Sequence, residues 1–228
     1  MATRGDLAGA CGYYEQAIAA ITQVGAVEDV IRMRAQQARL YWLLGDEEAS
    51  TAAVAEAQRH AERVTWPSAL AELAFAQAGL ARWRGDTEGA ARQLEVATTL
   101  LGDGADHASI RAGTADLLGY LTEDLDEARR HRAAACRAAA EAGYAPVLAQ
   151  VLVGVADLAL RREEHAQAAR LLAAATAVRG LPDQAHPDAA RIEQAARRGL
   201  GDAAFAEATR EGARTSWSHL VEVTLAAR

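Results

Sequence analysis

The chain has 228 residues, 51% hydrophobic and 24% charged, which is long and apolar enough to bury a sizeable core. Its formal net charge of −7 is the wrong sign for a protein that neutralises phosphates, so beyond a local basic strip we expect no direct nucleic-acid binding. All 24 basic residues are arginine, and the absence of lysine excludes Schiff-base chemistry and a P-loop lysine.

The sequence predicts a cytoplasmic protein with no membrane association. The N-terminal residues MATRGDLAGA lack the basic start and continuous apolar core of a signal peptide. The most apolar stretch, residues 147–160, is interrupted by Gln150 and Asp157 and is not expected to cross a membrane. Cys11 and Cys136 lie far apart without a C-x-x-C spacing, so we expect buried free thiols rather than a disulfide framework.

Helix starts and stops are well marked along the whole chain, which predicts an all-α fold. The predicted helices cover residues 15–24, 27–44, 47–64, 67–84, 87–101, 109–120 and 125–142, a hairpin over 149–179 with its corner at 161–164, and helices 188–200, 200–211 and 216–226. We expect a turn at Gly12-Tyr13 before the first helix and an N-cap at Asp46. Gly143 and Gly212 are expected to end the helices that precede them.

Small residues recur in pairs seven positions apart in the helix that follows each corner, so that they share one helical face. The pairs are Ala17/Val24, Ser50/Ala57, Ala90/Ala97, Ala128/Ala135 and Ala168/Ala175. Successive pairs are separated by 33 to 40 residues. A period of this size predicts a helical-repeat solenoid, in which the small residues let two helices approach closely.

The pattern resembles the tetratricopeptide repeat. That family has characteristic positions for small, aromatic, glycine and large residues. At these positions the second repeat has Ala38, Tyr41, Gly45, Ser50, Val54 and Ala57, and the third has Ala78, Gly85, Ala90, Leu94 and Ala97. Glu123 and Glu163 replace the corner glycine in later units, and Arg132 holds a position that is usually large and apolar. The resemblance implies a solenoid of antiparallel helix pairs over residues 1–179, closed by capping helices over residues 180–228 of the same domain.

In tetratricopeptide arrays the first helix of each unit lines a concave groove. The resemblance therefore implies nine groove residues: Arg32, Arg39, Trp42, Glu72, Phe75, Arg82, Gln150, Asp157 and Arg161. Aromatic and arginine side chains are common anchors of protein interfaces, although Trp42 and Phe75 equally fit ordinary packing. The subclass that clamps carboxylates uses lysine and asparagine, which this chain lacks, so we do not expect capture of chaperone tails.

A second resemblance concerns the last third of the chain. The run Ala169–Ala175 is followed by a Gly/Pro loop, Leu200-Gly201-Asp202, Phe205, Glu211 and Gly212. This order is similar to the C-terminal region of actinobacterial AfsR/SARP-type and LuxR-type (signal-transduction ATPase) transcriptional activators. In those proteins nucleotide-binding and DNA-binding domains precede the array, and here the first repeat is incomplete, so we expect a piece of a longer chain.

The expected function is a regulatory, protein-binding or effector-sensing region. Its expected partner is its own nucleotide-binding or DNA-binding domain, an outside protein or a small effector. The alternative is a free-standing tetratricopeptide adaptor with no attached DNA-binding domain. The length of the parent open reading frame would separate the two.

No residue pattern points to catalysis, a cofactor or a metal, so the chain is not expected to be an enzyme. The six histidines include no His-x-x-x-His or Glu-x-x-His pair, and no serine lies in a Gly-x-Ser-x-Gly elbow. Asp183, His186 and Asp188 cluster in a segment where turn-forming residues are expected anyway. The basic run 129–132 follows acidic residues at helical spacing, which favours charge pairing on a solvated face.

Overall fold

The computed structural model describes residues 7–102, 108–180 and 186–226, and within them every regular element is an α-helix. The helices are α1 (Leu7–Val24), α2 (Val27–Leu43), α3 (Glu47–Ala61), α4 (Pro67–Trp83), α5 (Thr87–Leu101), α6 (Ala108–Leu121), α7 (Leu125–Ala142), α8 (Ala145–Arg161), α9 (His165–Arg179), α10 (Pro187–Leu200), α11 (Asp202–Arg214) and α12 (Trp217–Ala226). The prediction of an all-α protein is confirmed. The chain divides into two compact units, residues 1–106 and 107–228.

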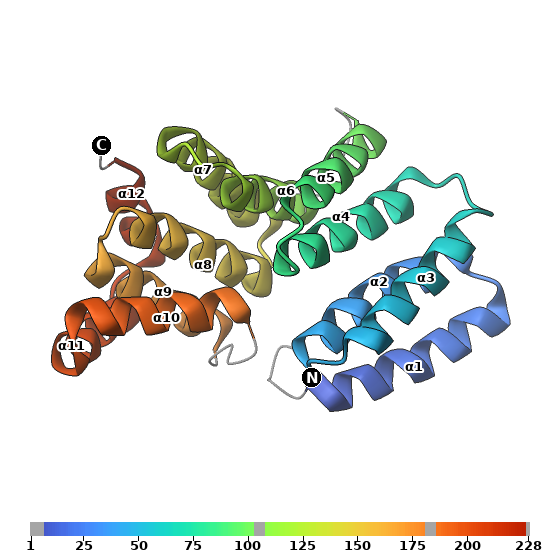
Figure 1. The fold of residues 1–228 in the computed structure, drawn as a ribbon, viewed down its shortest axis with the longest axis horizontal. Coiled ribbons are helices and arrows are strands. Elements are labelled where there is room, and N and C mark those ends of the chain that lie inside the picture. The colour runs from blue at the N-terminus through green and yellow to red at the C-terminus, as the bar shows by residue number, and fades with distance from the viewer. Residues whose placement is uncertain (1–6, 103–107, 181–185, 227–228) are drawn as a thin grey trace. The chain divides into compact units, whose positions relative to one another are not determined.

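Unit 1 contains two tightly packed helix pairs, α2 with α3 and α4 with α5, and α1 packs on α2 (Figure 1). The pairs associate mainly through α2 and α4, the first helix of each pair. Polar side chains join α1 to α2, since the Glu15 carboxylate accepts hydrogen bonds of 2.7 Å from both Arg34 and Gln37. Because the two pairs associate through α2 and α4, the side chains of these two helices lie next to one another.

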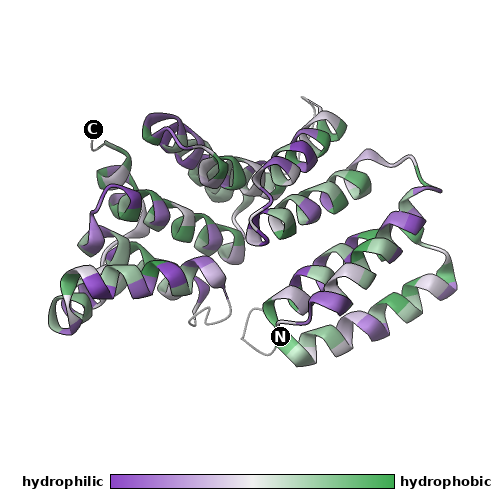
Figure 2. Ribbon diagram, viewed as in Figure 1, coloured by the Kyte–Doolittle hydropathy of each residue, from purple (hydrophilic) through white to green (hydrophobic). Residues whose placement is uncertain are grey.

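Unit 2 repeats this arrangement with the pairs α6 with α7 and α8 with α9. Helices α6, α8 and α10 are neighbours, as are α9 and α11, and α12 packs on α7, α8 and α9. The centre of the unit is α8, in which ten consecutive or near-consecutive residues are buried; its core-facing members include Val151, Leu152 and Val155. Figure 2 shows that most other helices have one hydrophobic and one hydrophilic side, as expected for helices with one solvated face.

The small-residue pairs lie at helix contacts in four of the five units. Ser50, Ala57, Ala90, Ala97, Ala128, Ala135 and Ala168 are fully buried, and Ala175 is 6% exposed. The first pair was predicted wrongly, because Ala17 is half-buried and Val24 is 79% exposed. Helix α1 packs chiefly on α2, and this pair of residues is not buried by that contact.

Three of the four corners between paired helices, α2–α3, α4–α5 and α8–α9, place a residue in the left-handed conformation, and the α6–α7 corner does not. Gly45 and Gly85 have φ values of 80° and 82°, in the left-handed region. Glu163 takes the same place at the α8–α9 corner with φ of 61°, so a residue with a Cβ adopts a conformation that favours glycine. The Asp46 side chain accepts a hydrogen bond of 2.9 Å from the Ala49 backbone N–H, which confirms the predicted N-cap.

Two glycines have roles other than those predicted. The expected turn at Gly12-Tyr13 lies inside α1, which begins at Leu7. Gly212 was expected to end a helix, but α11 continues through it to Arg214. The reason is close packing, since a Cβ on Gly212 would overlap the backbone of Arg170 in α9. In the described residues no helix is long and apolar enough to span a membrane.

Candidate functional site

Two arginines from neighbouring helices approach one tryptophan in unit 1. The guanidinium carbon of Arg39, on α2, lies 5.5 Å from the ring centroid of Trp83, the last residue of α4. The guanidinium carbon of Arg82, also on α4, lies 6.0 Å from the same centroid. Both distances are within the range of cation–π attraction, so the structure brings together two of the predicted groove residues around a ring. We call Arg39, Arg82 and Trp83 the α2–α4 cluster.

The α2–α4 cluster concentrates positive charge. Burial and the neighbouring Arg82 charge lower the pKa of the Arg39 guanidinium, although Tyr14 acts in the opposite direction. Arginine remains protonated despite such a shift. The α2–α4 cluster therefore combines an aromatic ring with two guanidinium groups, a combination that suits an acidic or aromatic group of another molecule.

Trp42, another predicted groove residue, lies on α2. The side chain of Arg84, at the end of α4, lies over its ring. The Arg84 guanidinium carbon is 5.0 Å from the Trp42 ring centroid, and its Nη2 donates a 3.2 Å hydrogen bond to the Thr51 hydroxyl. Trp42 is half-buried and packs against the buried residues Ala38, Ala53 and Leu80. Its role in packing is therefore confirmed, and its role as a groove anchor stays a prediction.

Arg32 and Glu72 connect α2 and α4 nearer the N-terminal ends of both helices. The Arg32 Nε lies 3.4 Å from Glu72 Oε1, and its Nη2 donates a 3.1 Å hydrogen bond to the Ser68 hydroxyl. The Trp66 ring, 55% exposed, has the Arg32 guanidinium 5.9 Å from its centroid. Phe75, the remaining predicted groove residue of unit 1, is half-buried on α4.

In unit 2 two of the three predicted groove residues, Asp157 and Arg161, make internal contacts. Arg161 donates hydrogen bonds of 3.2, 2.8 and 2.7 Å to the carbonyl oxygens of Gly119, Thr122 and Glu123, at the C-terminal end of α6. A cation at this end satisfies carbonyls that have no helical partner. Gln150 is half-buried on α8. The side chain of Arg161 therefore holds α6 to α8.

Asp157 is 4% exposed and belongs to a group of charged residues that we call the buried ionic cluster. Its members are Asp116, Arg132, Asp157, Asp188 and Arg191, from α6, α7, α8 and α10. Arg132, 0% exposed, pairs with Asp116, and its Nη2 lies 3.7 Å from Asp157 Oδ2. Arg191 reaches in from the surface to pair with Asp157 and lies 3.6 Å from Asp188.

Two glycines make the space for Arg132. A Cβ on Gly119 of α6 or on Gly154 of α8 would overlap the Arg132 guanidinium, and the second would also overlap the Asp116 carboxylate. The Tyr120 ring centroid lies 4.0 Å from the Arg132 guanidinium carbon. Burial, followed by the charges of Asp188 and Asp116, raises the pKa of Tyr120 well above its usual value. The cluster is therefore a packed, charged core that joins four helices.

Sequence reasoning missed most of this cluster. Arg132 was placed with its neighbours on a solvated face, and that is wrong for Arg132 alone, because Arg129 does pair with Asp126 at 3.2 Å. His186 and Asp188 are buried rather than merely turn-forming, while Asp183 lies outside the described residues. The available signal was an arginine at an apolar repeat position, which is stable in a core only beside a buried carboxylate.

Other reactive groups in the described residues are poorly placed for chemistry. Cys11 and Cys136 are buried free thiols, as predicted, and burial raises the pKa of Cys136 to about 12. A thiol with so high a pKa carries almost no thiolate at neutral pH and is a weak nucleophile. Among the described residues no three His, Cys, Asp or Glu side chains are placed to hold a metal ion.

Comparison with family models, curated protein sequences and solved structures gave no match to this chain. The function is therefore inferred from the geometry of the two units. In unit 1 that geometry is the α2–α4 cluster.

Proposed function

We propose that the chain is a tetratricopeptide-like repeat array that binds another protein through the α2–α4 cluster. The observation that carries the proposal is the approach of Arg39 and Arg82, from two neighbouring first helices, to the ring of Trp83. Arginine and tryptophan are over-represented among the residues that dominate binding energy at protein interfaces. In such an array this is where a groove would lie, since α2 and α4 are in contact.

The repeat assignment is supported by the order of contacts. The pairs α2–α3, α4–α5, α6–α7 and α8–α9 are the most extensive helix contacts, and the first helices of successive pairs are neighbours within each unit. Buried small residues at repeated positions allow this close approach. The contact pattern is that expected of stacked helical repeats, in which each unit touches the next.

The proposed role is regulation within a bacterial transcriptional activator of the SARP or LuxR type, in the cytoplasm. The partner would be the activator's own nucleotide-binding or DNA-binding domain, or an outside protein. Contact with one of two states of that partner would bias its inactive–active equilibrium by roughly 1–3 kcal/mol, which corresponds to about 5- to 150-fold. The proposed role is binding, without catalysis by this chain.

The experiment introduces R39A/R82A into the intact activator and measures promoter activation and ATP hydrolysis. The matched control is R59A/R63A. It removes two exposed arginines of unit 1 that are not part of the α2–α4 cluster, with the same change in charge. We expect R39A/R82A to change activation at least fivefold while R59A/R63A does not. Equal behaviour of the two double variants in both assays would refute the proposed surface.

A free-standing adaptor is the second candidate, and one observation favours it: the α2–α4 cluster is complete within unit 1. Such a surface needs no attached domain in order to bind a partner. Sequencing the reading frame upstream of Met1 distinguishes the candidates, because an adaptor would have no nucleotide-binding or DNA-binding segment there.

A further inference from the structure

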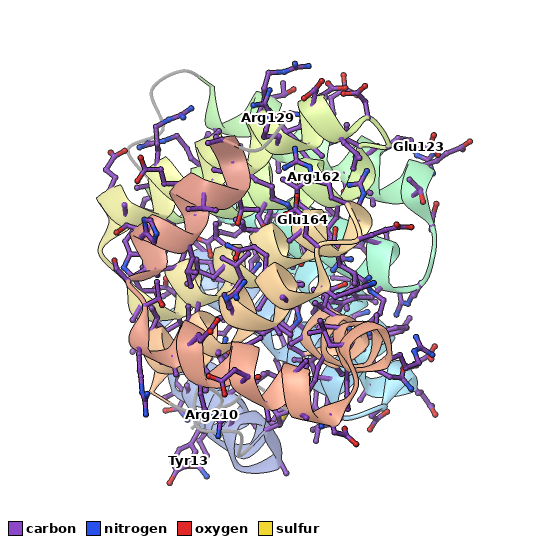
Figure 3. The ribbon with its side chains drawn as sticks, turned by 90° about the vertical axis from the view of Figure 1, so that its left-hand side faces the viewer. Tyr13, Glu123, Arg129, Arg162, Glu164 and Arg210 are labelled. Atoms are coloured by element: carbon purple, nitrogen blue, oxygen red, sulfur yellow. The ribbon has the colours of Figure 1, made fainter. Side chains whose placement is uncertain are left out.

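Helix α1 of unit 1 has an uncovered apolar side. Tyr13 is 57% exposed and Val24 is 79% exposed, while Ala20 is exposed and Ala17 half-buried. These four residues follow one another at spacings of four, three and four, so they lie along one side of the helix, which we call the α1 face. Figure 3 shows Tyr13 on the outside of α1. An apolar surface in contact with water gains free energy when another apolar surface covers it.

Helix α1 also carries almost no charge. Glu15 is the only charged residue in its sequence, and the Glu15 carboxylate accepts hydrogen bonds from Arg34 and Gln37 of α2. The exposed surface of α3, in contrast, includes Glu47 and Arg59. The α1 face therefore has no charged side chain that would oppose its burial against another apolar surface.

Helix α7 is the counterpart of α1 in unit 2. Both helices have 18 residues. Each is followed by a glycine in the left-handed conformation, Gly25 with φ of 75° and Gly143 with φ of 61°. In both cases the next helix begins two residues after that glycine. The two helices therefore correspond residue by residue, starting from Leu7 and Leu125.

In α7 the side that corresponds to the α1 face is covered. Ala135 and Ala138, the counterparts of Ala17 and Ala20, are 0% and 8% exposed. The helix with the most extensive contact on α7 is α6, to which a short corner joins it, so the two are antiparallel. Within the described residues only α2 packs extensively on α1. By comparison with α7, the α1 face is the side on which an antiparallel helix packs.

The order of residues on the α1 face is the same in both directions along the helix. Two large residues, Tyr13 and Val24, lie at its ends, and two alanines lie between them. If two copies of α1 pack antiparallel about a two-fold axis midway between Ala17 and Ala20, Tyr13 of each copy meets Val24 of the other and Ala17 meets Ala20. The alanines then let the helix axes approach closely. A contact with an unrelated helix requires no such symmetry, so the order favours a second copy of this chain.

We propose that the α1 face is a homodimer interface, in which α1 of a second copy takes the place that α6 has on α7. A helix of 18 residues is about 27 Å long, so the contact lies at the small end of specific interfaces. We therefore expect a dimer that dissociates in the micromolar range. This inference goes beyond the proposed function and uses none of the residues of the α2–α4 cluster.

The test is sedimentation equilibrium of the full chain over a range of concentrations. We expect a mass that rises with concentration from the 24.1 kDa of one chain toward about 48 kDa. A mass of one chain up to about 200 μM would overturn the proposal, since a micromolar dimer is formed at that concentration.

Ala20 provides the decisive variants, because it is exposed and next to the proposed two-fold axis. A20E and A20R each bring two like charges together across the axis, so each should weaken the dimer at least tenfold. An equimolar mixture of A20E and A20R brings opposite charges together and should form the dimer again. A19E and A19R are the matched controls, because Ala19 is exposed on another side of α1 and its counterpart in α7, Arg137, is exposed as well. We expect both controls to dimerise like the parent.

Three results with these variants would overturn the proposal. Equal weakening by the substitutions at Ala19 and Ala20, or weakening by neither, would exclude the α1 face as the interface. A mixture of A20E and A20R that does not dimerise more strongly than either variant alone would exclude the antiparallel two-fold contact. Circular dichroism of each variant verifies that it is folded.

Discussion

The buried ionic cluster allows a specific prediction about the stability of unit 2. Replacing Arg132 by methionine keeps a long, unbranched side chain in the space beside Gly119 and Gly154, and removes the charge together with the 2.7 Å hydrogen bond that Nη1 donates to the Asp116 carbonyl. Asp116, 1% exposed, then loses the cation with which it pairs, whereas Asp157 keeps Arg191. R132M therefore removes the paired cation of one buried carboxylate.

Removing one member of a buried ion pair costs about 3–5 kcal/mol, because the remaining charge is desolvated without compensation. Arg132 has no exposed surface and Asp116 almost none, so solvent does not screen the loss and we expect R132M to fall within that range. Adding D116N removes the stranded charge, and the double variant should recover at least about 1.5 kcal/mol relative to R132M. Urea-induced unfolding followed by far-ultraviolet circular dichroism measures each value.

The pH dependence provides an internal check. In R132M, burial without a cation raises the pKa of Asp116 in the folded state above that in the unfolded chain. The folded state then holds a proton that the unfolded state releases, so the stability of R132M relative to the parent increases as the pH falls through the folded pKa. We expect the difference between R132M and the parent to be smaller at pH 5 than at pH 8. A difference below about 1 kcal/mol that does not vary with pH would refute this account of the cluster.

Three further predictions concern backbone and packing, each measured by urea unfolding. Gly212→Ala should destabilise by more than about 1 kcal/mol because its Cβ meets the rigid backbone of Arg170, whereas Gly12→Ala, with open space around it, should stabilise by about 0.5–1 kcal/mol. Glu163→Gly should stabilise by up to about 1 kcal/mol by removing a Cβ from a left-handed conformation, and an equal loss would show that the Glu163 side chain matters more than its backbone. Ala168→Leu should cost on the order of 1–3 kcal/mol through overpacking, and a loss under about half a kcal/mol would contradict its position at a helix contact.

Local signals in the sequence predicted the helices well because capping and periodicity act within a few residues. Asp46 caps a helix through its own neighbours, so its role does not depend on the rest of the fold. Gly143 ends α7 in the left-handed conformation, as predicted, whereas Gly212 lies inside a helix. Gly212 packs against the backbone of Arg170 in α9, and a contact between two helices leaves no local pattern in the sequence.

The candidate site was predictable only in part for the same reason. Helical spacing placed Arg39 and Arg82 on first helices, but the ring they share, Trp83, was not among the predicted groove residues. Arg161 satisfies the rule for a groove residue and is nevertheless used to cap α6. Which arginine contacts solvent and which holds a helix end depends on residues about 40 positions away in the chain, beyond the range of periodicity.

The two cysteines are distributed so that each compact unit contains one. Cys11 lies in α1 of unit 1 and Cys136 in α7 of unit 2, and both are buried. A thiol reagent can reach either only when the helices around it separate, so the labelling rate of each cysteine reports the opening of its own unit. Mass spectrometry after timed labelling, with C11S and C136S to identify the two sites, would show whether denaturant opens both units in one event or one before the other. The native sequence thus carries its own pair of unfolding probes, with no need for an added dye or an introduced residue.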